Sequence, residues 1–259
     1  MRQRINLRYI LDEAIRVVAL VSSSNYNEIM NKVVFVTGAS RGIGLATVQK
    51  FVDKGFSVAG FYNQQEGPKI KNVSWYKLDI SKYSSIKESF AKAFSEFKRI
   101  DCLVNCAGVF GYKDLVGYDE DLMDRVISIN EKGTYLCTKE VLGKMTEGSI
   151  INISSTAAQV GSSDPIYAAT KSAILGFTKS MAKSLAPKIR VNCIAPGATN
   201  TDMMKNYKPE RVQQLKEMTL LKRLAESEDI ANSIYFLSSD EAKHITGICL
   251  DINGGYVLR

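Results

Sequence analysis

Short, almost uninterrupted apolar runs recur along this chain and alternate with longer segments of mixed character. The runs are rich in Val and Ile, which is typical of strands that are buried on both faces of a parallel sheet. They predict the strands Lys32–Thr37, Ser57–Phe61, Val73–Leu78, Asp101–Asn105, Ser149–Ser154, Ile189–Ile194 and Gly247–Leu250.

Segments of helical length lie between these runs, at Ile43–Lys54, Ser84–Lys98, Asp119–Lys144 and Ile166–Ala186. Strands that alternate with helices are joined by right-handed crossovers. The pattern therefore predicts an α/β protein of Rossmann type, with a doubly wound, mostly parallel sheet and helices on both faces.

Two segments fall outside this alternation. Residues 1–29 precede the first strand, so we expect an N-terminal extension followed by a single domain over residues 30–259. Gly197–Ala225 is polar and longer than a usual loop, and segments of this kind are often lids over a site.

The composition excludes several kinds of site from this protein. Of the 259 residues, 45% are hydrophobic and 24% are charged, as in an ordinary globular protein. The 5 Cys are odd in number and form no CxxC pair, which argues against a disulfide framework and favours a reducing cytoplasm. Because His244 is the only histidine, no cluster of histidines can hold a metal, and we predict no metal site.

The formal net charge of +7 suits an anionic cofactor or an acidic partner. The lysines are scattered rather than clustered, so nucleic-acid binding is not expected. Ala14–Val21 is too short for a membrane span and is broken by Arg16. We therefore expect neither a membrane segment nor a secretory signal.

A glycine-rich turn follows the first predicted strand. In the run TGASRGIG, Gly38 permits a tight turn, Gly42 lets the backbone approach a pyrophosphate, and Gly44 lets the next helix pack closely on the sheet. An anion would then lie at the positive end of the helix dipole. The alternative is an ordinary glycine-rich turn, which the strand before and the helix after disfavour.

Tyr167 and Lys171 are four positions apart on a predicted helix and so share one face. A free tyrosine titrates near about 10, and a neighbouring ammonium lowers that pKa by stabilising the phenolate. Tyr167 would then exchange protons with a carbonyl or alcohol oxygen. An isolated pair at this spacing usually marks only a helix face, so the interpretation depends on the upstream glycine loop.

Further motifs follow in order: Leu78-Asp79-Ile80, Asn105-Cys106-Ala107-Gly108, Ser128-Ile129-Asn130, Ser154-Ser155, Tyr167-Ala-Ala-Thr-Lys171 and Pro196-Gly197. Together with the glycine loop, they resemble the short-chain dehydrogenase/reductase family over residues 32–259. One departure is Cys106, which stands where the family has a second Asn.

The resemblance implies an NAD(P)-dependent oxidoreductase that interconverts a carbonyl and a secondary alcohol. The implied catalytic residues are Asn130, Ser155, Tyr167 and Lys171, with Ser154 as the alternative to Ser155. The implied cofactor contacts are Gly38, Ser40, Arg41, Gly42, Ile43, Gly44, Tyr62, Asp79, Ile80, Asn105, Ala107, Gly108, Tyr167, Lys171, Pro196, Gly197, Thr199 and Thr201.

The finer assignments also come from resemblance. The glycine loop, the Tyr167–Lys171 pair and the ending 251–256 resemble 3-oxoacyl-[acyl-carrier-protein] reductases, whose acidic carrier protein a basic chain would suit. Sugar and other alcohol dehydrogenases share these motifs, and a non-catalytic cofactor sensor is a further alternative. The family is usually tetrameric, with the Tyr167 helix and the last strand at subunit contacts.

NADP(H) is expected in preference to NAD(H), which stays the alternative. The position where an NAD enzyme commonly has an acid falls on Tyr62, and neither Tyr62 nor Asn63 carries a negative charge. Arg41, inside the glycine loop, supplies a guanidinium that could hold a 2′-phosphate through parallel hydrogen bonds.

Overall fold

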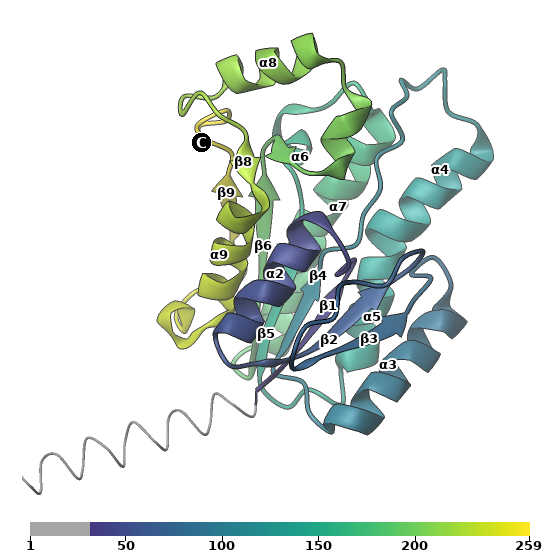
Figure 1. Cartoon of the computed structure of the whole chain (residues 1–259), viewed down its shortest axis with the longest axis vertical. Coiled ribbons are helices and arrows are strands. Elements are labelled where there is room, and N and C mark those ends of the chain that lie inside the picture. The colour runs from purple at the N-terminus through teal and green to yellow at the C-terminus, as the bar shows by residue number, and fades with distance from the viewer. Residues whose placement is uncertain (1–31) are drawn as a thin grey trace, which may run out of the picture.

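Figure 1 shows a parallel sheet enclosed by helices, in a computed structural model that describes residues 32–259. The predicted extension 1–29 lies outside the described residues. The sheet has the strand order β3-β2-β1-β4-β5-β6-β9, and every neighbouring pair is parallel. Its strands are β1 Val33–Thr37, β2 Ser57–Tyr62, β3 Val73–Lys77, β4 Cys102–Asn105, β5 Gly148–Ile153, β6 Ile189–Pro196 and β9 Cys249–Ile252.

Two hydrophobic layers lie on opposite faces of this sheet. Helices α2 (Gly42–Asp53) and α9 (Ser227–Ser238) pack on one face, and α3 (Tyr83–Phe97), α5 (Gly133–Val141) and α7 (Pro165–Leu185) pack on the other. Within β1, Val34 and Val36 face the first layer while Val33 and Phe35 face the second. Because both faces are buried, the strands read as unbroken apolar runs, and the predicted Rossmann-type fold is confirmed.

The segment predicted as one helix, Asp119–Lys144, is three elements in succession. It consists of α4 (Glu120–Ile127), a π-helical turn η1 (Ser128–Lys132) and α5, which ends at Val141. The predicted end was wrong because Leu142 is extended and Gly143 has a positive φ of 87°. Apolar periodicity does not reveal such a wider turn inside a helix.

The segment Gly197–Ala225 is more regular than expected. It contains the short strand β7 (Thr199–Asn200), paired with β8 (Ala225–Glu226), then the 3-10 turn η2 (Asp202–Asn206) and helix α8 (Pro209–Met218). None of the α8 residues is buried, and its apolar residues Val212 and Leu215 are only half-buried, so the sequence pattern gives a weak helix signal here. Together with α6 (Ala157–Val160), α8 lies beyond one end of the sheet (Figure 1).

The last strand begins two residues later than predicted, at Cys249, because Gly247 has a φ of +79° and belongs to the preceding turn. The 3-10 turn η3 (Asp240–Ala242) follows α9. Within residues 32–259, no helix combines the length and the apolar character that a bilayer span requires.

Candidate active site

The strand order reverses between β1 and β4, and in open parallel sheets ligands bind beyond the strand ends at such a point. Thr37, the last residue of β1, joins the two strands there. Its Oγ1 accepts hydrogen bonds from the backbone N–H groups of Cys106 at 3.1 Å and Ala107 at 3.2 Å. The turns after β1 and β4 are therefore fixed to one another.

The glycine-rich turn cannot accept side chains at two positions. Gly38 has a φ of +65°, and a Cβ there would lie 2.8 Å from Ala107 Cα. A Cβ on Gly44 would lie 2.1 Å from the Gly38 carbonyl oxygen. These contacts bring the first turn of α2 directly over the end of β1.

This turn fits an anion. Arg41, the N-cap of α2, makes no side-chain capping bond, and the first turn contains no acidic residue. The first N–H groups of a helix have no partner within it and carry the positive end of its dipole. Uncapped donors above a glycine cradle suit the pyrophosphate of a dinucleotide, so the residues present fit a nicotinamide cofactor.

A second segment covers the glycine turn from the side of β6. Gly197, after β6, donates its N–H to Ile252 O at 2.9 Å, and Thr199 Oγ1 donates to Gly197 O at 2.9 Å. Thr201 then lies beside Gly42, where a Cβ would be 3.4 Å from Thr201 Cγ2. A cavity of about 460 Å³ opens here, lined by Gly42, Asn200, Thr201, Asp202, Met204, Lys205, Val212 and Leu224.

The residues expected near the adenosine have partners of their own. Asp79 accepts from Ser81 Oγ at 2.6 Å and pairs with Lys82, and these contacts lower its pKa, with Ser81 the largest cause. Tyr62 donates its hydroxyl to Glu66 Oε2 at 3.1 Å. A carboxylate therefore does lie at the end of β2, although neither residue considered from the sequence carries one.

Asn105 is buried, and its Nδ2 donates to Asn152 Oδ1 at 2.9 Å and to Thr138 Oγ1 at 3.1 Å. Its Oδ1 has no hydrogen-bond partner among residues 32–259. Ile80, the neighbour of Asp79, is also buried and lies against Gly133 of α5. Both side chains are thus part of the core below the expected cofactor site.

Four predicted residues come together at the reacting centre. Lys171 is only 5% exposed and donates Nζ to Ile153 O at 2.8 Å, with Nζ 5.8 Å from the centre of the Tyr167 ring. A Cβ on Gly108 would lie 3.4 Å from both Lys171 Nζ and Asn130 Oδ1. The chain after β4 therefore runs directly beside the lysine and the asparagine.

The π-helical turn positions Asn130. Its Oδ1 accepts from Val109 N at 2.8 Å, and its Nδ2 donates to Val109 O at 2.9 Å. The Asn130 side-chain amide thereby holds both backbone groups of Val109, in the chain after β4. Single π turns inside α-helices are frequent at functional sites, and this one directs a buried amide toward Lys171.

The two candidate serines point in different directions. The Ser155 hydroxyl lies near the Tyr167 hydroxyl and lowers its pKa, and the Ser155 Oγ accepts from Ala157 N at 3.1 Å. Ser154 is buried and donates its hydroxyl to Lys171 O at 2.8 Å, toward the backbone of α7. Only Ser155 therefore faces the tyrosine oxygen.

Burial dominates the electrostatics of this centre. It raises the pKa of Tyr167 to about 12, and the hydrogen bond from Ser155 opposes that rise. Burial also lowers the pKa of Lys171 to about 8. The expectation that Lys171 lowers the pKa of Tyr167 is wrong for this structure, because the ammonium bonds to Ile153 O and desolvation outweighs its influence.

Asp164 is a positioning residue that the sequence analysis missed. This buried carboxylate caps α7 by accepting from Tyr167 N at 3.0 Å, and it also accepts from Tyr118 Oη at 2.6 Å, Gly111 N at 2.8 Å and Tyr112 N at 3.0 Å. An Asp immediately before Pro165 is a helix-start signal that identifies the cap. The sequence contains no signal for the contacts that Asp164 makes with residues 111–118.

Aromatic rings line one side of Tyr167. The Phe110 ring lies 4.5 Å from the Tyr167 ring, Tyr112 lies 4.8 Å from Phe110, and Tyr207 lies 5.9 Å from Tyr112, between ring centres. Tyr112 also donates its hydroxyl to Met203 O at 2.8 Å. The loop after β4 and the η2 segment therefore form one apolar wall beside the reacting hydroxyls.

Two neighbouring hydroxyls, a buried amine and a glycine turn that fits an anion meet at one end of a doubly wound sheet. No three His, Cys, Asp or Glu side chains within residues 32–259 come together as a metal site. This combination defines a dinucleotide-dependent oxidoreductase, in which the protein supplies the proton and the cofactor carries the hydride.

Comparisons with known proteins agree with this class. A family profile described as "Enoyl-(Acyl carrier protein) reductase" matches residues 38–257. The 3-oxoacyl-[acyl-carrier-protein] reductase FabG of Staphylococcus epidermidis is 36% identical over 241 residues, which cover 87% of this chain and 99% of that protein.

Two solved structures are also similar. A short-chain dehydrogenase/reductase of Brucella melitensis, described as a glucose/ribitol dehydrogenase, has a TM-score of 0.85 at 31% identity and covers 88% of this chain and 98% of its own. A blue fluorescent protein from a metagenomic library in complex with NADPH has a TM-score of 0.80 at 29% identity, with coverages of 88% and 98%.

The chain belongs to the short-chain dehydrogenase/reductase family. It is an NAD(P)-dependent oxidoreductase that interconverts a carbonyl and an alcohol by hydride transfer.

Replacing Ser155 by Ala should reduce kcat by about 10²-fold or more, since the variant loses a hydroxyl that faces the reacting oxygen. Ser154→Ala is the matched control and should cost much less, because Ser154 bonds only to helix backbone. Steady-state kcat for one substrate and one cofactor measures both. The assignment fails if Ser154→Ala proves the more damaging change.

Proposed function

We propose that this enzyme is a 3-oxoacyl-[acyl-carrier-protein] reductase, which converts the 3-oxo group of an acyl thioester into a 3-hydroxy group. The observation that carries the reaction type is the Ser155–Tyr167 hydroxyl pair beside buried Lys171, at the same sheet end as the glycine cradle. The substrate class rests on the Staphylococcus relative, nearly all of whose length this chain covers.

In the reductive direction Tyr167 donates its proton to the substrate oxygen while Ser155 hydrogen-bonds that oxygen and orients the carbonyl. When bound, a reduced nicotinamide supplies the hydride. Lys171, whose Nζ lies 5.8 Å from the centre of the Tyr167 ring, would hold the ribose of the cofactor, and Asn130 fixes the chain beside it. Gly38, Gly42 and Gly44 would cradle the pyrophosphate.

The substrate side of the site suits an acyl chain on an acidic carrier. Phe110, Tyr112 and Tyr207 provide an apolar wall next to Tyr167. The exposed basic residues Lys205 and Lys208 lie on the same segment as Tyr207, and the whole chain carries +7. Opposite charge on a partner speeds encounter and fixes orientation.

A substrate panel tests this proposal through the absorbance of the reduced nicotinamide. A 3-oxoacyl thioester on carrier protein should give a higher kcat/KM than a 2-enoyl thioester or, in the oxidative direction, an aldohexose. Tyr167→Phe should lower kcat by about 10²–10⁴-fold without loss of cofactor binding. Tyr235→Phe, on α9 across the sheet, is the control that should keep full turnover.

Preferred turnover of the aldohexose would replace the proposal with a sugar dehydrogenase, the activity by which the Brucella relative is described. Preferred turnover of the enoyl thioester would instead favour enoyl reduction, the activity named in the description of the family profile. Full activity in Tyr167→Phe would remove the catalytic assignment itself.

NADP(H) is the preferred cofactor. Arg41 is exposed within the glycine loop, and no acidic side chain occupies position 62 at the end of β2. The Glu66 carboxylate that accepts from the Tyr62 hydroxyl would repel a 2′-phosphate. The preference therefore rests on Arg41 outweighing Glu66.

Three substitutions test the cofactor preference by the ratio of kcat/KM with NADPH to that with NADH. Arg41→Ala should lower the ratio by removing the phosphate ligand, and Tyr62→Asp should lower it by adding repulsion. Glu66→Gln should raise the ratio, because it removes a negative charge while the side chain keeps nearly the same shape. A wild-type ratio below one would overturn the preference.

The enzyme works in the cytoplasm as a homotetramer, with the outer face of α7 at a subunit contact. In support, Gly176 is exposed on α7, and a Cβ there would meet no atom within 4 Å among the described residues. No contact among the described residues therefore requires a glycine at this position. The absence of a side chain would let a second helix approach closely.

Gly176→Arg should break the tetramer without unfolding the chain, because the added side chain extends into open space. Light scattering gives the mass and thermal unfolding checks the fold. Asn63→Arg, at an exposed loop position, is the control that should stay tetrameric. A monomeric wild type, or a Gly176→Arg variant that stays tetrameric, would rule this interface out.

A further inference from the structure

Two cysteines outside the active site lie side by side on neighbouring strands. Cys193 of β6 and Cys249 of β9 are register partners in a parallel pair, so their side chains share one face of the sheet. Neighbouring strands run about 4.7–4.9 Å apart, which is within the Cα separation that a disulfide spans. Both thiols are free, and the Cys249 Sγ donates to Asp251 Oδ1 at 4.0 Å.

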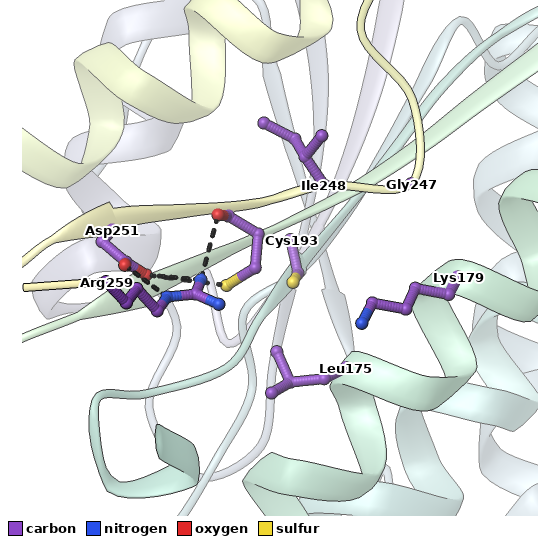
Figure 2. Close-up of a pocket in the computed structure, with 8 residues that line it drawn as sticks. Leu175, Lys179, Cys193, Gly247, Ile248, Asp251 and Arg259 are labelled. Atoms are coloured by element: carbon purple, nitrogen blue, oxygen red, sulfur yellow. Dashed lines mark hydrogen bonds and ion pairs between the residues drawn. The ribbon is translucent and has the colours of Figure 1, made fainter. Parts of the chain in front are cut away.

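The two thiols differ in access. Cys249 is half-buried, whereas Cys193 is 1% exposed. They line a pocket of about 480 Å³ together with Leu175, Lys179, Gly247, Ile248, Asp251 and Arg259 (Figure 2). In the single chain, a small reagent that enters the pocket therefore meets the Cys249 sulfur first and finds a second thiol behind it.

The neighbours of Cys249 act on the pKa of its thiol in both directions. Arg259 donates Nη2 to the Cys249 carbonyl at 3.3 Å and pairs with Asp251, and Figure 2 shows the guanidinium and the Lys179 amine in the same pocket. The pKa of Cys249 is lowered, with the neighbouring Cys193 as the largest cause. Arg259 lowers this pKa further, whereas burial and the Asp251 carboxylate raise it. Burial instead raises the pKa of Cys102 and of Cys106 to about 12.

We propose that Cys249 and Cys193 form a reversible thiol-oxidation site, in which a hydroperoxide oxidises Cys249 and Cys193 then closes an intramolecular disulfide. An accessible, activated thiol backed by a resolving thiol is the arrangement that redox-responsive proteins use. This inference does not depend on the substrate of the enzyme.

The chemistry balances with the hydroperoxide as the only oxidant. The Cys249 thiolate attacks the outer peroxide oxygen, the O–O bond breaks, and the leaving oxygen takes up a proton to give water from hydrogen peroxide. Cys249 is then a sulfenic acid. The Cys193 sulfur attacks the Cys249 sulfur, the S–O bond breaks, and hydroxide leaves with the Cys193 proton as water.

Mass mapping of the whole enzyme tests this site. The enzyme is treated with hydrogen peroxide, its remaining thiols are alkylated, and it is digested with trypsin without reduction. The peptides 191–205 and 244–259 should be joined, two hydrogens lighter than their sum, and dithiothreitol should separate them. Peptides 100–113 and 133–139, which hold the other three cysteines, should carry alkylated thiols only.

Variants separate the two roles. In Cys193→Ala the sulfenic acid should persist on peptide 244–259, where dimedone traps it, and Cys249→Ala should form neither the acid nor the bridge. Arg259→Gln should slow oxidation by up to about tenfold, the change in thiolate fraction for each pKa unit. Cys137→Ala, at a buried position of α5, is the matched control and should form the bridge at the wild-type rate.

The proposal fails if folded wild-type enzyme yields no 191–205 to 244–259 link. It fails equally if peptide 244–259 joins to a copy of itself from another chain, or if Cys106 and Cys137 oxidise as fast as Cys249.

Discussion

Two backbone hydrogen bonds to Thr37 Oγ1 hold the active centre together. They join the end of β1 to the chain after β4 where the strand order reverses, and Gly38 then lies so close to Ala107 that no side chain fits between them. Gly108, next along, lies beside Lys171 and Asn130. The anion cradle and the reacting centre are therefore parts of one rigid unit, and the distance between them is set by backbone contacts.

Burial then determines which protonation states this unit favours. The pKa of Tyr167 near 12 keeps its proton in place, and an alkoxide formed by hydride addition is a stronger base than a phenolate, so a protonated tyrosine suits reduction. Lys171, with its pKa near 8, has only Ile153 O as a close partner among the described residues. A buried ammonium with so little compensation gains most when a negative charge forms nearby.

The sequence predicted those parts of the molecule where the residue type is compatible with only one structural role. The strands of the sheet are apolar throughout because both faces are buried, and Gly38 and Gly44 stand where a Cβ cannot fit. Helix α8 was missed because none of its residues is buried. The pKa of Tyr167 was predicted in the wrong direction, because the four-residue spacing to Lys171 reveals a neighbour but not the desolvation of both groups.

The two sides of the site are built by different means. Glycines and backbone hydrogen bonds form the cofactor side, whereas side chains distant in sequence form the substrate side. Tyr112 reaches Met203 across 91 positions, and Asp164 ties the start of α7 to Gly111, 53 positions earlier. A single substitution can change such a side-chain contact on the substrate side while the sheet stays intact. A fixed cofactor unit can therefore serve many carbonyl substrates, and we expect the residues from 110 to 118 and from 199 to 218 to select among them.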